Sequence, residues 1–208
     1  MKFTKYALAT LLSCNFLQGA VIATQDFDLS TGWTPIYSPE LDSFSSVNDA
    51  WTIRSVINGF SVGSGDFLAT RDIENNDNPS GSATIELGLV DTSNYENVSI
   101  SFDYGTSGFD VGDNVVYTVV IDGVDQTPIT LVEGSSVSGG VTVDSTESIT
   151  IAGTPSTVGL KVTITQDGSS DYSGLDNFVL EGDLITVPEP STVLLSALAL
   201  LGLVRRKR

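Results

Sequence analysis

Apolar and polar residues alternate with a period of two in four segments of the chain, at residues 83–89, 98–104, 115–121 and 160–164. Successive side chains of a β-strand point to opposite faces, so this alternation predicts strands with one buried face. Further strands are expected at residues 128–133, 140–144, 148–152 and 175–181, and less distinctly at 25–29, 51–57 and 67–71. No segment between residues 24 and 187 has the 3.6-residue periodicity of an amphipathic helix.

Clusters of Gly, Asn, Asp and Ser separate these segments. One of them is Asp122-Gly123, where the glycine can adopt the positive φ that a tight hairpin turn requires. About ten short strands in a domain of this length are typical of a jelly roll. The sequence therefore predicts an all-β fold, a two-sheet antiparallel β-sandwich of the jelly-roll type, over residues 24–187.

The order of several short motifs along the chain favours the same fold. The motifs are Trp51 and residues 65–68, 97–102, 119–123 and 174–179. This layout resembles the galactose-binding-like and carbohydrate-binding jelly rolls of secreted bacterial proteins. The resemblance implies an architecture, and a fold alone does not transfer a function.

The C-terminal end has three parts in a fixed order. A Pro-Glu-Pro break precedes an apolar run, interrupted by Ser196 and Gly202, and a basic cluster ends the chain. As a helix, residues 191–204 would cover roughly 21 Å, against about 30 Å of bilayer hydrocarbon. Basic residues prefer the cytoplasmic face, so the domain would lie on the other side of the membrane. The alternative is a buried helix of a soluble domain, but such a helix has a polar stripe and this one is apolar all round.

These residues carry a second resemblance. The break is Pro188, Glu189 and Pro190, and the cluster is Arg205, Arg206, Lys207 and Arg208. Together with the apolar run, they resemble the PEP-CTERM sorting signal of Gram-negative bacteria. The resemblance implies a sorting tail at residues 188–208, recognition by an exosortase-type membrane enzyme, removal of the tail near the Pro-Glu-Pro, and delivery to the cell surface or exopolysaccharide matrix. The tail would hold the chain at the inner membrane only until processing.

The N-terminal end predicts a secretory signal peptide. Lys2 and Lys5 precede an apolar helix, and Val21 and Ala23 are small residues at the positions that signal peptidase reads. We expect a leader of residues 1–23, cleaved after Ala23. The alternative is a lipoprotein site at Cys14. Without it the mature chain has no cysteine and no disulfide, since Cys14 is the one cysteine of the chain.

The charge of residues 24–187 limits the partners of the domain. The segment holds three basic residues, Arg54, Arg71 and Lys161, and 25 acidic ones, so its net charge is −22. Such a field repels nucleic acid, so binding of DNA or RNA is excluded, and it favours the binding of cations.

The missing residue types restrict catalysis. The chain has no histidine, which excludes Ser-His-Asp and Cys-His catalysis and zinc sites of ordinary composition. Glycoside hydrolysis needs only two carboxylates and remains a lesser alternative. No Glu-x-Asp-x-Glu strand is present, and Glu181-Gly182-Asp183 is the nearest pattern. We therefore expect a protein that is not an enzyme.

Calcium is the expected cofactor, in a structural role, because it prefers oxygen ligands. Asp26 and Asp28 share a face of the first strand, and Asp176 lies in the last strand, which in a jelly roll is often its neighbour. In calcium-binding carbohydrate modules of similar layout, acids at both chain ends share an ion. A second candidate is the loop 110–114, with Asp110, Asp113 and Asn114. The alternative is that these side chains are solvated or cap turns.

Aromatic side chains in loops are the candidates for sugar binding. Trp33, Tyr37 and Tyr172 lie in segments rich in turn residues, whereas Trp51 lies in an alternating segment and is assigned to the core. Ordinary packing is the alternative for each of the three. Two functions stay open: an exported surface or matrix protein whose jelly roll binds polysaccharide, and a structural matrix protein without a specific ligand.

Overall fold

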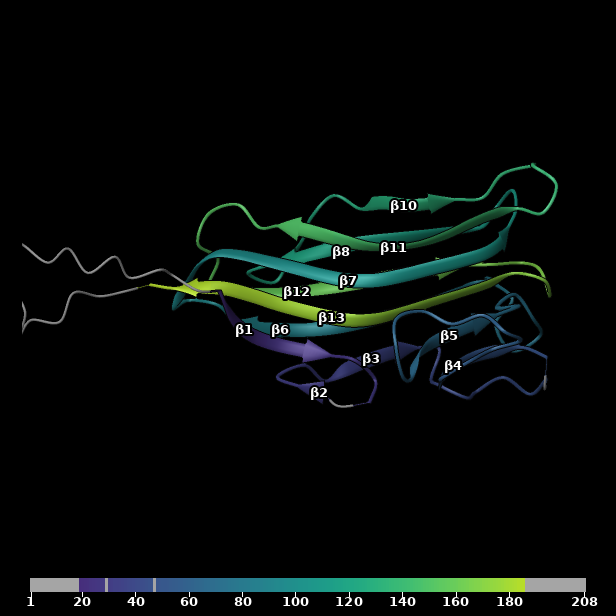
Figure 1. Ribbon diagram of the computed structural model, residues 1–208, viewed down its shortest axis with the longest axis horizontal. Coiled ribbons are helices and arrows are strands. Elements are labelled where there is room, and N and C mark those ends of the chain that lie inside the picture. Colours follow the sequence, from purple (N-terminus) through teal and green to yellow (C-terminus); the bar gives the residue numbers. More distant parts are fainter. Residues whose placement is uncertain (1–18, 29, 47, 186–208) are drawn as a thin grey trace, which may run out of the picture.

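The computed structural model describes residues 19–28, 30–46 and 48–185, and this part of the chain contains strands and no helix (Figure 1). The strands, in chain order, are β1 (Ala20–Gln25), β2 (Ser30–Thr31), β3 (Pro35–Ser38), β4 (Ala50–Arg54), β5 (Phe67–Arg71), β6 (Ser82–Asp91), β7 (Tyr95–Phe109), β8 (Asn114–Ile121), β9 (Val124–Asp125), β10 (Ile129–Glu133), β11 (Val141–Thr150), β12 (Thr157–Thr165) and β13 (Tyr172–Leu184).

The strands form two antiparallel sheets packed face to face. The first has the order β11-β7-β13-β1-β2. In addition, β5 pairs with β13, and β4 pairs with β5. The second has the order β10-β8-β12-β6-β3, with β9 paired to β8. In Figure 1 the first sheet lies in front of the second. The expected all-β sandwich is confirmed.

The core forms where the alternating segments face each other. Phe102 of β7 and Phe178 of β13 stack with ring centroids 5.1 Å apart, and both are fully buried. Trp51 is also buried, as expected. Leu89 differs from the expected pattern, because it is 50% exposed. The pairing of β6 with β12 shifts register between Leu87 and Val90, and this bulge turns Leu89 to solvent while Val90 packs against the core.

The first and last strands are neighbours. Ala20 pairs with Gly182 and Ala23 pairs with Leu180, so both ends of the described chain lie at the same end of the sandwich (left in Figure 1). Residues 20–23, which the sequence assigns to the end of the leader peptide, are therefore part of a strand. A cut after Ala23 would remove most of β1.

The other terminal predictions lie outside the described residues. These include the leader up to residue 18, the sorting residues 188–190 and 205–208, and the apolar helix between them. Among residues 19–185, without 29 and 47, no helix is long and apolar enough to cross a bilayer.

Candidate functional site

Asp26 and Asp28, which were predicted within the first strand, follow the end of β1 at Gln25. Their carboxylates lie near enough to Asp176 to raise its pKa, and we call Asp26, Asp28 and Asp176 the strand cluster. Asp176 has no exposed surface, and neither of its oxygens accepts a well-formed hydrogen bond from a described residue. Burial raises the pKa of Asp176 to about 7, against the effect of the Asn177 backbone amide, and the carboxylates of Asp103, Asp26 and Asp28 raise it further. A buried carboxylate in this state favours a proton or a cation beside it.

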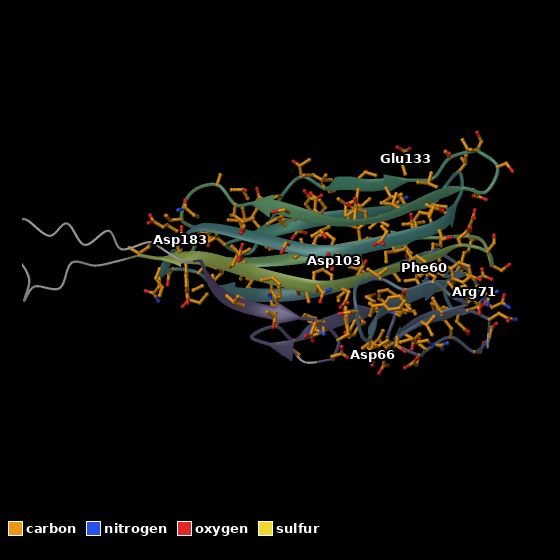
Figure 2. The ribbon with its side chains drawn as sticks, in the orientation of Figure 1. Phe60, Asp66, Arg71, Asp103, Glu133 and Asp183 are labelled. Atoms are coloured by element: carbon orange, nitrogen blue, oxygen red, sulfur yellow. The ribbon has the colours of Figure 1, made fainter. Side chains whose placement is uncertain are left out.

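A bulge in β13 follows Asp176 directly. Asn177 has a φ of 51°, and the pairing of β13 with β7 shifts register between Asp176 and Val179. The Asn177 amide donates to Asp103 at 2.8 Å, which holds the bulge against β7. Figure 2 shows Asp103 near the middle of the sandwich.

A glycine-rich loop, residues 61–66, lies against the strand cluster. A Cβ atom at Gly63 would collide with the carboxylate of Asp176, and one at Gly65 with the carboxylate of Asp28. The backbone amide of Asp66 makes long contacts of 3.4 Å to both oxygens of Asp28. The loop therefore approaches the carboxylates more closely than a side chain would allow.

A second group of aspartates lies at the end of the sandwich away from the chain termini, and we call Asp110, Asp167 and Asp171 the loop cluster. One oxygen of each lies within 4.8 Å of the others. The loop 110–114 was expected to supply Asp113 and Asn114 as further ligands. Instead, Asp113 is buried and accepts backbone amides, while the Asn114 amide donates to the Gly112 carbonyl at 3.3 Å.

The loop cluster borders a pocket of about 650 Å³, which we call the serine pocket. Asp110 lines it, together with the hydroxyl-bearing residues Ser107, Ser135, Ser136, Ser138 and Ser170. The lining offers hydroxyl groups, backbone groups and one carboxylate, and no described lysine or arginine.

Two of the three predicted aromatic ligand residues belong to the packing of the domain. Trp33 is 3% exposed, and its Nε1 donates to the Gly88 carbonyl at 3.0 Å. A ring with so little free surface cannot stack on a sugar, so its assignment to a platform was wrong. Tyr37 is half-buried in β3 and makes an edge contact with Trp51 at 6.1 Å, and burial raises its pKa to about 12.

Tyr172, the third, is half-buried at the start of β13. Its ring stacks with that of Phe60, with centroids 6.3 Å apart, and we call these two side chains the ring pair. The Arg71 guanidinium lies 5.6 Å from the Tyr172 ring centroid, and Asn58 Nδ2 donates to the Tyr172 hydroxyl at 2.9 Å. Figure 2 shows Phe60 and Arg71 together, far from Asp183 at the end where the chain termini lie.

Phe60, Arg71 and Asn58 were not predicted as site residues. Arg71 pairs with Tyr172 between β5 and β13, which are about a hundred residues apart in the sequence. No local pattern signals such a contact. The one available hint was that Arg71 is among only three basic residues of the domain.

The remaining evidence comes from sequence comparison. Residues 186–208 match the PEP-CTERM protein-sorting motif. The chain carries a PEP-CTERM sorting signal. This confirms the prediction made from residues 188–190 and 205–208, and it implies an exported chain with a membrane-held tail and an exosortase-type processing partner. No curated protein is significantly similar in sequence to this PEP-CTERM chain.

The chain is similar to several solved structures at low identity. The K1 cleaved adhesin domain of Lys-gingipain from Porphyromonas gingivalis W83 is 10% identical, with 80% of this chain and 99% of that chain covered and a TM-score of 0.48. A Stig cyclase, Fisc, from Fischerella sp. TAU has 10% identity, coverages of 81% and 100%, and a TM-score of 0.48. The CBM22-1 xylan-binding domain of Paenibacillus barcinonensis Xyn10C has 12% identity, coverages of 81% and 97%, and a TM-score of 0.37. At these values the likeness says nothing of ligand or reaction.

Proposed function

We propose that this PEP-CTERM protein is delivered to the cell surface or the exopolysaccharide matrix, and that its jelly roll binds polysaccharide without catalysis. An exosortase-type enzyme removes the tail near residues 188–190. The ring pair is the observation that supports sugar binding, since partly exposed aromatic rings next to polar groups are the usual platform for a sugar ring. Arg71 and Asn58 supply hydrogen-bond donors at its edge.

The proposal predicts that binding depends on the ring pair. We expect Tyr172→Ala and Phe60→Ala to weaken binding of the purified protein to its polysaccharide about tenfold or more, because each removes one face of the platform. Affinity electrophoresis against a panel of polymers, including the exopolysaccharide of the host, measures this effect. Tyr95→Ala is the matched control, since Tyr95 is also a half-buried tyrosine at a strand end but lies at the other end of the sandwich.

Failure of the wild-type protein to bind any polymer would favour the second candidate, a structural matrix protein without a specific ligand. One observation supports this candidate independently. The domain carries a net charge of −22, from 25 acidic and three basic residues. That charge keeps the protein dispersed in a hydrated matrix without any binding site.

We also propose that the strand cluster holds a structural calcium ion. The unpartnered carboxylate of Asp176 and the close glycine loop over Asp28 support this. A carboxylate at this position would be stabilised by a divalent cation. We expect calcium to raise the melting temperature of the purified protein relative to EGTA, and Asp176→Asn to remove most of that shift. An equal midpoint in calcium and EGTA would rule this ion out.

A further inference from the structure

The loop cluster combines acidic residues from two connections that are far apart in the sequence. Asp110 follows β7, while Asp167 and Asp171 lie between β12 and β13. In the described part of the chain, this is the one group of three acidic side chains whose carboxylate oxygens all approach within 4.8 Å. Oxygens bound to one calcium ion at 2.3–2.6 Å can lie up to about 5 Å apart, so the spacing fits a shared ion.

Asp171 gives independent support for a bound cation. It is 1% exposed, and its Oδ2 atom has no hydrogen-bond partner among the described residues. The other oxygen receives only a 3.4 Å contact from the Ser170 hydroxyl. A Cβ atom at Gly168 would collide with the Asp171 carboxylate, so the backbone closes tightly around it. A buried carboxylate oxygen without a donor needs a counter-charge to be stable when ionised.

Asp113 holds the two loops in place. It is 1% exposed, and its Oδ2 accepts the backbone amide of Asp110 at 2.9 Å. Its Oδ1 accepts the backbone amide of Asp167 at 3.2 Å. Asp113 therefore fixes the positions of Asp110 and Asp167 relative to each other, which leaves their own carboxylates available for another partner.

No basic side chain neutralises this group. Among the described residues, neither lysine nor arginine forms a salt bridge with Asp110, Asp167 or Asp171. Arg71 is close, but its Nε donates to the Ser169 carbonyl at 2.8 Å. Burial raises the pKa of Asp171 to about 6, and the negative charges of Asp113, Asp110 and Asp167 add to this effect.

We propose that Asp110, Asp167 and Asp171 bind a calcium ion at the wall of the serine pocket. The ligands are all oxygen atoms, which suits a hard cation, and the chain has no histidine to favour a transition metal. Calcium takes six to eight oxygen ligands, more than three carboxylates supply in single contacts. In the proposed site, water fills the other positions, or hydroxyl groups of a molecule that enters the pocket beside Asp110 and Ser170. This site shares no residue with the strand cluster or with the ring pair.

Calcium titration of the purified protein by calorimetry tests the proposal, after treatment with EGTA and its removal. The variants are Asp171→Asn, Asp176→Asn and their combination, and Asp144→Asn is the control at an exposed carboxylate of β11. We expect the wild type and the control to bind two ions, each single variant one ion, and the combination none. Circular dichroism in EGTA checks that the isosteric variants are folded.

Each site can fail without the other. If Asp171→Asn binds as many ions as the wild type, the loop cluster is not a calcium site and the proposal is overturned. If the wild type binds one ion that only Asp171→Asn abolishes, the loop cluster is confirmed and the ion proposed at Asp176 is excluded. If only Asp176→Asn abolishes a single ion, the result overturns the present inference and leaves the strand cluster in place.

Discussion

At the scale of single residues, the domain places ionisable groups where neighbouring residues do not stabilise their charge. Asp176 lies fully buried in the strand cluster, and Asp171 is nearly so in the loop cluster. Both have a raised pKa, to about 7 and about 6, with burial as the main cause. Each carboxylate therefore lowers the free energy of unfolding whenever it is ionised without a cation.

This arrangement predicts an unusual pH dependence in the presence of EGTA. The folded protein holds the Asp176 proton up to a pH of about 7, whereas the unfolded chain releases it near a pH of about 3.9. The folded state therefore binds more protons within this window, and stability falls as the pH rises from 5 to 8. We expect a loss of roughly 2–3 kcal/mol, since the loss accumulates over the two pH units between 5 and about 7 and one unit corresponds to about 1.4 kcal/mol.

Urea unfolding of the wild type and of Asp176→Asn at pH 5 and pH 8 measures this effect. The variant should lose less stability than the wild type over this range, because it keeps the shape of the side chain without its titration. Asp144→Asn, at an exposed position, should behave as the wild type does. Equal losses in the wild type and in Asp176→Asn would contradict the assignment.

At the scale of strands, the sequence pattern predicted the alternating segments well, because β6, β7, β8 and β12 each bury one face. It failed where pairing overrides pattern. Two separate strands were expected at 140–144 and 148–152, but one strand, β11, spans both. Its polar middle, residues 144–147, reads as a turn, yet these residues pair with β7 at the sheet edge, where both faces tolerate polar side chains.

The candidate sites show the same limit: the sequence predicts residues chosen from their local pattern and misses those that strand pairing brings together. Tyr172 and the strand cluster could be chosen from residue type and chain position, because the first and last strands of a jelly roll are often neighbours. Arg71 could not, since only the pairing of β5 with β13 brings it to Tyr172. Phe60 could not either, since it reaches Tyr172 from the connection between β4 and β5. The loop cluster was predicted in part. Asp110 was a candidate ligand from its own loop, but Asp167 and Asp171 lie in a distant connection that only the folded chain brings to it.

Strand β1 supplies a prediction at this scale. A chain beginning at Gly19 should be more stable than one beginning at Thr24, by roughly 2 kcal/mol, because the shorter chain loses backbone hydrogen bonds to β13 and the buried Ala23 side chain. Thermal and urea unfolding of the two chains give the difference. Mass spectrometry of the exported protein then shows which start the cell uses, and equal stabilities would mean that residues 19–23 contribute nothing to the sheet.

At the scale of the whole molecule, the two chain ends and the candidate ligand sites lie at opposite ends of the sandwich. Ala20 pairs with Gly182 at one end, and Phe60 and Arg71 lie near the other (Figure 2). The described chain therefore begins and ends at one end of the sandwich, whereas the serine pocket and the ring pair lie at the other.

The sorting signal gives a prediction for the exported chain. Replacing residues 188–190 by alanine should block removal of the tail, because the match to the sorting motif covers this segment. The protein should then stay in the membrane fraction with a mass larger by the tail, as read by mass spectrometry of the intact chain. Alanine at Glu181, an exposed acid upstream of the motif, is the control. Normal release of the altered chain would show that another segment directs processing.

One strand joins the two ends. β13 begins at Tyr172 in the ring pair and ends at Leu184, just before the tail, and its 13 residues span about 43 Å. It is an inner strand of its sheet, with β7 on one side and β1 and β5 on the other. Under the proposed function, a force between a polymer at Tyr172 and a held tail would run along β13 and load its flanking hydrogen bonds together, in shear. One continuous strand would then carry the force from the proposed binding site to the end of the domain that precedes the sorting signal.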